Sequence, residues 1–232
     1  MLDFDKYEVL SFDCYGTLID WESGILASLR PVLTAHGIEM GDEDILKLYA
    51  ELESEAEKGT FAKYREILRR VMQNLGERLD FEPSASELDH LGDTLKDWPA
   101  FPDSPGALAA LKKRYKLAIV SNIDNDLFAE SNKHLKVEFD WLVSAEKVQS
   151  YKPALRHFEV ALEEFGVGLE KQLHVAQSLY HDIGPANKMG LDCVWVNRRH
   201  GQEGGGATPD ASGQPNLEVP DMQTLVSMMG LD

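Results

Sequence analysis

Short apolar runs that alternate with helical segments are the feature that most constrains the fold of this chain. An apolar run at 9–13 is followed, from residue 107 onward, by helices and strands that take turns. Strands are predicted at 117–121, 141–144, 173–176 and 193–196, with helices at 107–114, after Asn125, at 153–165 and at 183–189. Strands separated by helices form a parallel sheet with helices on both faces. We therefore expect an α/β fold, whose ligands bind beyond the carboxyl ends of the strands.

The segment between the first strand and residue 98 has a different character. Apolar residues recur there with helical spacing in four stretches, at 25–33, 45–52, 61–71 and 88–95. Pro99 and Pro102 then forbid a continued helix, so the chain is predicted to return to the main domain at that point. Residues 198–216 are rich in Gly and contain two prolines, which predicts a long loop. The sequence thus indicates a helical insert within an α/β domain.

Composition and charge exclude several classes of function. The 232 residues carry a formal net charge of −17, which disfavours nucleic acid and anionic membranes as partners because both are bound mainly through Lys and Arg. Apolar runs stay far below the roughly 20 residues that span a bilayer, and the acidic N-terminus is unlike a secretory signal. Only Cys14 and Cys193 occur, so we expect free, buried thiols and a reducing, cytoplasmic compartment.

Polar signals fall at the ends of the predicted strands. They are Asp13 with Thr17, Ser121 with Asn122, Lys152, and Asp182. Taken singly, each is more often a turn former or a helix cap. At one end of one sheet, however, they would assemble a nucleophile, hydroxyl and amide donors, a cation and a second carboxylate.

At these positions the sequence resembles a known family. Residues 13–18 (Asp-Cys-Tyr-Gly-Thr-Leu) resemble the first motif of the haloacid-dehalogenase superfamily, 120–122 its second, 150–153 its third and 180–182 its fourth. The helical insert is similar to the family's cap. The resemblance implies a Rossmann-like, doubly wound parallel sheet as core domain at 1–17 and 99–232, with a helical cap domain at 18–98.

The resemblance also implies catalytic roles. Asp13 would be the nucleophile and would form an ester with the substrate that water later cleaves. Lys152 would keep Asp13 ionised, since a carboxylate in a dry pocket otherwise has a raised pKa. Asp182 would orient Lys152 or activate the hydrolytic water.

Residues around these three would bind the substrate. Thr17 and Ser121 offer hydroxyl donors and Asn122 an amide, either to Asp13 or to the charged end of the substrate. The remaining substrate-binding candidates are Tyr15 and Ser178. They occupy the positions at which superfamily phosphatases carry an acid for the leaving oxygen and a second acid of motif four.

The absence of those two acids decides between branches. Without them an alkoxide leaves poorly and Mg²⁺ has too few oxygen ligands, so a phosphatase becomes the minor alternative. The chain then resembles the 2-haloacid dehalogenases, which displace a substituent from C2 of a short carboxylic acid with no metal or other cofactor. Phe158, Gln177 and Leu179 depart from that branch, in which a Tyr, a Ser and an Asn are usual.

The second helix of the insert, predicted at 42–57, departs further. It has no Arg to cradle a halide, and its Glu51, Glu53, Glu55 and Glu57 form two acidic rows at i, i+4 spacing. One row facing the substrate would favour a cation. Residues 97–103, 121–125 and 198–201 look similar to azetidine-2-carboxylate hydrolase, whose substrate amine is protonated at neutral pH. We keep this ring-opening activity, and an inactive binding protein of the same fold, as alternatives.

Several features stay open at the level of sequence. Tyr180 and His181 either reach the pocket or pack under the sheet, and Arg198 with Arg199 either grips a carboxylate or lies exposed. Three aromatic residues form either an apolar wall around the substrate or ordinary packing: Trp21, Trp98 and Phe101. The expected partner is a small 2-substituted carboxylic acid, and the oligomeric state, with a homodimer as one option, is not set by the sequence.

Overall fold

A parallel sheet forms the centre of the molecule in the computed structural model, which describes residues 2–201, 206–209 and 211–231. Within these residues the sheet has six strands in the order β3-β2-β1-β4-β5-β6, and every neighbouring pair is parallel. The strands are β1 (Val9–Phe12), β2 (Lys116–Ser121), β3 (Trp141–Ser144), β4 (Gln172–Ala176), β5 (Asp192–Val196) and β6 (Leu217–Val219). Strand β1 lies between β2 and β4, so a residue that follows β1 is central at the carboxyl edge.

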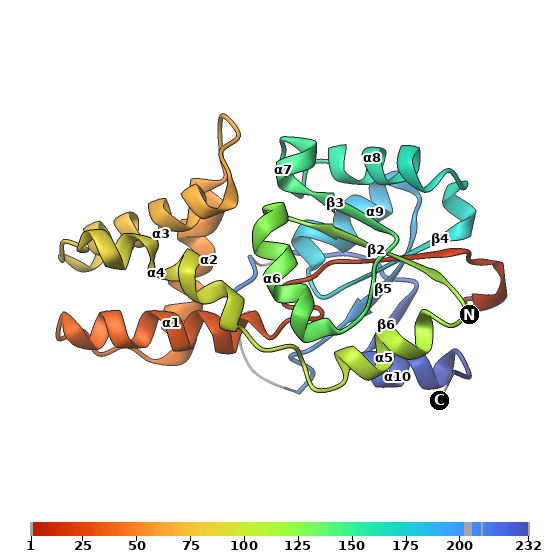
Figure 1. Ribbon diagram of the computed structural model, residues 1–232, viewed down its shortest axis with the longest axis horizontal. Coiled ribbons are helices and arrows are strands. Elements are labelled where there is room, and N and C mark those ends of the chain that lie inside the picture. Colours follow the sequence, from red (N-terminus) through yellow and green to blue (C-terminus); the bar gives the residue numbers. More distant parts are fainter. Residues whose placement is uncertain (1, 202–205, 210, 232) are drawn as a thin grey trace.

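Helices cover both faces of this sheet (Figure 1). On one face, α5 (Ser104–Leu111), α6 (Asn125–Leu135) and α10 (Met222–Met228) share an apolar cluster with Leu10, Phe12 and Ile119. On the other face, α8 (Arg156–Phe165) packs on Val9 and Val120, and α9 (Gly184–Met189) packs on β5. Near-continuous apolar strands of this kind are typical of parallel sheets that are buried on both sides. The predicted doubly wound α/β fold is confirmed.

Four helices of the insert form a separate group to one side of the sheet, as Figure 1 shows at the left. They are α1 (Trp21–Ala35), α2 (Asp42–Ala56), α3 (Tyr64–Leu79) and α4 (Ala85–Thr94). Trp98 packs directly on Gly24, where a Cβ atom would lie 2.3 Å from the indole. Helix α1 can therefore pack this closely on Trp98 only with glycine at position 24. The division into a core at 1–17 and 99–232 and a cap at 18–98 stays a prediction, although the helices are placed as it expects.

The two connections between the insert and the sheet run side by side. Asp20 N donates to Pro99 O at 2.8 Å and Phe101 N donates to Leu18 O at 3.0 Å. These bonds tie the start of the insert to its end, and thereby fix where α1 and α2 stand relative to Asp13.

Several elements differ from the sequence-based expectation. The helix expected at 153–165 begins only at Arg156, and the one expected at 107–114 spans Ser104–Leu111. Helices α7 (Ala145–Val148) and α10 and strand β6 were not predicted, because each is too short to show a clear period. The predicted loop at 198–216 contains no helix or strand in its described part, and residues 202–205 and 210 lie outside the described residues.

The two cysteines lie as the sequence predicts. Cys14 and Cys193 are free and buried, as predicted. In the described ranges no helix is both long and apolar enough to cross a membrane.

Candidate active site

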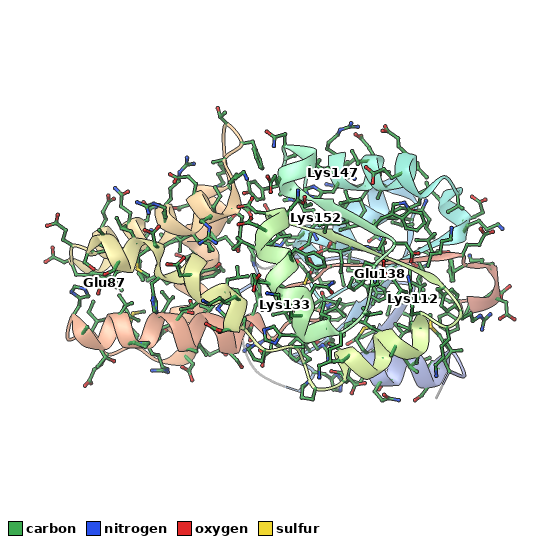
Figure 2. The ribbon with its side chains drawn as sticks, viewed as in Figure 1. Glu87, Lys112, Lys133, Glu138, Lys147 and Lys152 are labelled. Carbon is green, nitrogen blue, oxygen red and sulfur yellow. The ribbon has the colours of Figure 1, made fainter. Side chains whose placement is uncertain are left out.

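The carboxyl edge of the sheet brings four predicted catalytic and binding residues together. Asp13 directly follows β1 and Ser121 ends β2, while Lys152 lies in the loop between α7 and α8. Asp182 lies in η4 (Leu179–Ile183), a single π-helical turn after β4. Figure 2 shows Lys152 on the side of the core that is nearer to helices α1–α4. Parallel strands end at one edge, which is why residues so far apart in the sequence meet here.

Lys152 joins the two acids. Its Nζ donates to Asp13 Oδ1 at 3.0 Å, to Asp182 Oδ1 at 2.6 Å and to Val120 O at 2.9 Å. An ammonium has three N–H donors, so all of them are used, and the side chain is only 1% exposed. Burial lowers the pKa of Lys152, but the charges of Asp13 and Asp182 outweigh it and hold that pKa above its usual value. Lys152 therefore stays a fixed cation.

Asp13 is held by three side chains. Besides Lys152, Thr17 Oγ1 donates to Asp13 Oδ2 at 2.8 Å and Ser121 Oγ donates to Oδ1 at 3.4 Å. Burial raises the pKa of Asp13, and the Lys152 charge opposes that rise. The turn after β1 makes the Thr17 contact possible, because Gly16 adopts φ +87° and a Cβ there would lie 2.8 Å from Trp21 Nε1.

A residue of the sheet, His174 in β4, orients Asp182. His174 Nε2, in β4, lies 3.0 Å from Asp182 Oδ1, the oxygen that also accepts from Lys152. Burial raises the pKa of Asp182, but Lys152 and the hydrogen bond from His174 bring it down to about 2. Asp182 is thus ionised at neutral pH.

The structure contradicts one of the two expected roles of Asn122, the donor to Asp13, and substrate binding by this cavity-lining residue stays a prediction. Its amide does not contact Asp13: Oδ1 accepts from Lys152 N at 2.7 Å, and Nδ2 donates to Lys152 O at 3.1 Å and lies 3.4 Å from Glu57 Oε1. Asn122 therefore holds the backbone of Lys152 in place.

Tyr15 and Ser178 both line the cavity, yet their polar atoms have partners in the protein. The Tyr15 hydroxyl lies 2.8 Å from Ser131 Oγ. Ser178 Oγ caps η4, since it accepts from His181 N at 2.9 Å and lies 3.1 Å from His181 Nδ1. Binding of substrate by these two residues stays a prediction.

A small cavity opens in front of Asp13, with about 40 Å³ accessible to the centre of a water molecule. Its walls come from the sheet edge, from α1–α3 and from the loop at Thr208. The lining residues are Asp13, Tyr15, Trp21, Glu53, Glu57, Tyr64, Ser121, Asn122, Lys152, Gln177, Ser178, His181, Asp182 and Thr208. Of the eight site residues predicted from sequence, Thr17 alone is not among them, because it lies behind Asp13.

The acidic row that lines the cavity is Glu53 with Glu57. Glu53 is 4% exposed and accepts from the Tyr49 hydroxyl at 3.0 Å and from the Tyr64 hydroxyl. Burial raises the pKa of Glu53 to about 7, against the two tyrosine bonds, and burial together with Glu53 raises the pKa of Glu57. The other row, Glu51 with Glu55, is exposed. Of the two acidic rows that the sequence predicts, the one that faces the cavity is therefore Glu53 with Glu57.

The residues left open by the sequence take different places. Trp21 and His181 line the cavity, whereas Trp98 packs on α1 and Tyr180 packs on His181. Neither arginine reaches the cavity. Arg198 donates to both oxygens of Asp103 at 2.9 Å and to Thr17 O, above the ring of Phe101, and Arg199 pairs with Glu22 and Glu43.

Three residues of the site were missed in the sequence. They are Tyr64, Thr208 and His174. His174 carried a signal, since it is a titratable residue inside a predicted buried strand. Tyr64 and Thr208 are brought to the cavity only by tertiary packing.

Comparison with known proteins agrees with the fold. The family model described as haloacid dehalogenase-like hydrolase matches residues 10–196. Haloacetate dehalogenase H-2 of Moraxella sp. is 26% identical over 97% of this chain and 99% of its own length. (S)-2-haloacid dehalogenase of Pseudomonas sp. strain YL is 27% identical over 97% and 95%. The fold is shared with L-2-haloacid dehalogenase of Xanthobacter autotrophicus, at a TM-score of 0.79 and 21% identity over 97% and 98%.

Proposed function

The chain belongs to the haloacid dehalogenase-like hydrolase family, and from that premise we propose that it displaces a substituent from C2 of a small carboxylic acid with Asp13 as nucleophile. The observation that carries the proposal is the buried Lys152, which holds Asp13 and Asp182 on one Nζ. A positioned carboxylate that is kept ionised is what covalent catalysis requires. A structure of the Xanthobacter enzyme has chloropropionic acid covalently bound, which supports an ester at the corresponding step.

In the first step an Asp13 oxygen attacks C2, and the bond between C2 and the leaving group breaks with its electron pair going to that group. Lys152 and Thr17 keep the attacking carboxylate ionised and in one rotamer. We assign the substrate carboxylate to neutral donors on the cavity wall. Gln177 is suited to this, because its Oε1 already accepts from Thr208 and its amide N–H groups are the donors.

In the second step water cleaves the ester. Water attacks the Asp13 carboxyl carbon and gives one proton to Asp182, the C2 oxygen leaves with the product, and that oxygen takes up the proton. Asp13 is first released as a carboxylic acid and then loses the second proton of the water. For a halide the sum is substrate plus water to a 2-hydroxy acid, a halide ion and a proton; for a ring amine the leaving nitrogen stays attached to the 2-hydroxy acid and takes up that proton. Asp13 regains its carboxylate with one oxygen from water.

A resident Mg²⁺ does not fit the donor set. Both candidate carboxylates already share Lys152, and the described residues include no group of three His, Cys, Asp or Glu side chains suited to a metal ion. Ser178 stands where a phosphatase of the superfamily would carry a further acid. We therefore derive no step through a metal.

The experiment that tests this function is a metal-free panel of 2-chloropropionate, azetidine-2-carboxylate and p-nitrophenyl phosphate. We expect turnover of a C2 substrate by the wild type and none by Asp13→Asn, whose amide keeps the shape of the side chain but is a poor nucleophile. Activity confined to the phosphate ester and dependent on Mg²⁺ would assign a phosphatase. No turnover of any substrate, together with no incorporation of ¹⁸O from labelled water into Asp13, would favour a binding protein.

A second candidate concerns the leaving group, and the Glu53–Glu57 wall favours it. Lys152 is the one Lys or Arg among the described lining residues, and it is occupied by the two aspartates. A halide that departs toward two glutamates meets acidic groups rather than a cradle of positive charge. A protonated ring amine, with a Lys-like pKa of about 10, is instead complementary to this wall. Hydrolysis of azetidine-2-carboxylate is therefore the second candidate.

The helix itself supplies a matched control for this candidate. We expect Glu53→Gln/Glu57→Gln to lower kcat/KM for azetidine-2-carboxylate at least ~10-fold, in line with the loss of one charge-assisted contact, and to spare 2-chloropropionate. Glu51→Gln/Glu55→Gln makes the same two substitutions on the exposed row and should leave both values unchanged. An equal effect of both double variants would mean that long-range charge is responsible. A wild type that prefers 2-chloropropionate would instead indicate that the leaving group is a halide.

A further inference from the structure

A buried polar row lies behind the active site, inside the sheet. Ser11 Oγ, in β1, lies 2.9 Å from His174 Nδ1 in β4, and His174 Nε2 lies 3.0 Å from Asp182 Oδ1. Ser11 is 3% exposed, and His174 and Asp182 are fully buried. A hydroxyl, an imidazole and a carboxylate in this order are costly to bury unless each bond is made.

The hydrogen-bonding roles in this row follow from Asp182. An ionised carboxylate only accepts, so His174 Nε2 must carry the proton that it shares with Asp182 Oδ1. With the proton on Nε2, Nδ1 can accept from the Ser11 hydroxyl. The edge of His174 also meets the ring of Phe158, with centroids 5.1 Å apart. The imidazole is thus fixed in one orientation.

The two oxygens of Asp182 are consequently unlike each other. Oδ1 accepts from both Lys152 and His174. Oδ2 is buried and, among the described residues, has no hydrogen-bond partner, although Asp182 lines the cavity. A buried acceptor without a protein partner points to water or a ligand as its partner.

We propose that His174, anchored by Ser11, is a positioning residue that holds Asp182 by Oδ1 and so leaves Oδ2 as the oxygen that takes the proton from the hydrolytic water. The proposal deepens the function proposed above and rests on its second step. His174 touches neither substrate nor water. It acts on ester hydrolysis and not on ester formation, because Asp13 receives its own contacts from Lys152, Thr17 and Ser121.

The test compares two substitutions of similar size in the full-length enzyme. His174→Gln keeps an N–H donor near the position of Nε2, whereas His174→Met removes the donor. Rapid-quench mass spectrometry follows the Asp13 ester with 2-chloropropionate or azetidine-2-carboxylate, whichever the wild type turns over. For His174→Met we expect ester formation within about threefold of wild type, ester hydrolysis slowed at least ~10-fold, and accumulated ester. For His174→Gln we expect hydrolysis to be largely restored.

A second readout needs no substrate. Carboxyl carbon NMR of the free enzyme follows the titration of Asp182, which is faced by Lys152, Asp13, His157, His174 and His181. His174→Met should raise its apparent pKa by about one pH unit or more, and His174→Gln should raise it less. If the wild type turns over neither 2-chloropropionate nor azetidine-2-carboxylate, the proposed function is wrong, and this titration alone decides the role of His174.

Two results would overturn the inference. One is a finding that His174→Met and His174→Gln slow ester formation as much as ester hydrolysis, which would mean general damage to the fold. The other is an unchanged Asp182 titration in His174→Met.

Discussion

Replacement of Lys152 by Met tests the electrostatic core of the site. The substitution keeps the length of the side chain but removes the charge that joins Asp13 and Asp182 at 3.0 and 2.6 Å. Coulomb's law at an effective dielectric constant of about 20 gives about 5.5 kcal/mol for unit charges 3.0 Å apart. That energy corresponds to about four powers of ten in rate, and entry of water into the site will offset part of it.

We expect kcat/KM of Lys152→Met to fall by about 10³-fold and the acid limb of the pH profile to move upward. The sign follows from the nucleophile, which must be ionised. Burial and the Asp182 charge both raise the pKa of Asp13, and Lys152 opposes them. Without Lys152 the pKa of Asp13 rises further, so activity is lost at a higher pH than in the wild type.

The assay is kcat/KM against pH for the better C2 substrate, with circular dichroism to confirm folding, because a buried pair that loses one partner costs about 3–5 kcal/mol of stability. Lys147→Met is the matched control, because Lys147 is half-exposed and pairs with Glu164 on α8 rather than with Asp13 or Asp182. A folded Lys152→Met enzyme with an unshifted acid limb would refute the reasoning, since Lys152 would then not govern the ionisation of Asp13.

Further expected outcomes follow from single contacts. Thr17→Val removes the donor to Asp13 Oδ2 and should lower kcat by ~10-fold or more, whereas Thr17→Ser keeps the hydroxyl and should retain most of the wild-type kcat. Equal kcat values for the two variants in steady-state assays would contradict this role of the hydroxyl. Glu53 has a pKa of about 7 in the folded protein against an ordinary 4.5, so the folded state binds more protons in that window and stability falls as pH rises through it. The free energy of unfolding of Glu53→Gln in urea should therefore match that of the wild type at about pH 4 and exceed it by about 3 kcal/mol at about pH 8. A difference that does not change with pH would mean that ionisation of Glu53 is not linked to folding. Arg198→Ala should destabilise the fold by about 3–5 kcal/mol because Asp103 loses the cation that contacts both its oxygens. Arg198→Lys should recover only part of this in the same denaturation assay, because one ammonium cannot also replace the contacts of the guanidinium to Thr17 O.

The fold was largely accessible from the sequence because its strands are buried on both faces. The apolar runs at β1, β2, β3, β4 and β5 stand out against the amphipathic helices between them, and each was located to within one residue at either end. Strand β6 and helices α7 and α10 escaped prediction, since three to seven residues do not complete a recognisable period.

The candidate site was accessible in part. Asp13, Lys152 and Asp182 were found because residues after parallel strands must meet at one edge of the sheet. The expected donor contact from Asn122 to Asp13 was wrong, because a side chain that binds a neighbouring backbone and one that faces the nucleophile look alike in a sequence. The choice between the rows Glu51–Glu55 and Glu53–Glu57 depends on how α2 is rotated against Tyr49 and Tyr64, which tertiary packing alone decides.

The most direct test of the account is a single turnover in ¹⁸O water with enzyme in excess over a C2 substrate. The ester route predicts one ¹⁸O atom in the peptide that contains Asp13 and none in the hydroxyl group of the 2-hydroxy acid, because that oxygen comes from Asp13 in the first turnover. Peptide and product mass spectrometry read both places at once. Label in the product with an unlabelled Asp13 would mean that water attacks C2 directly, and would contradict the account.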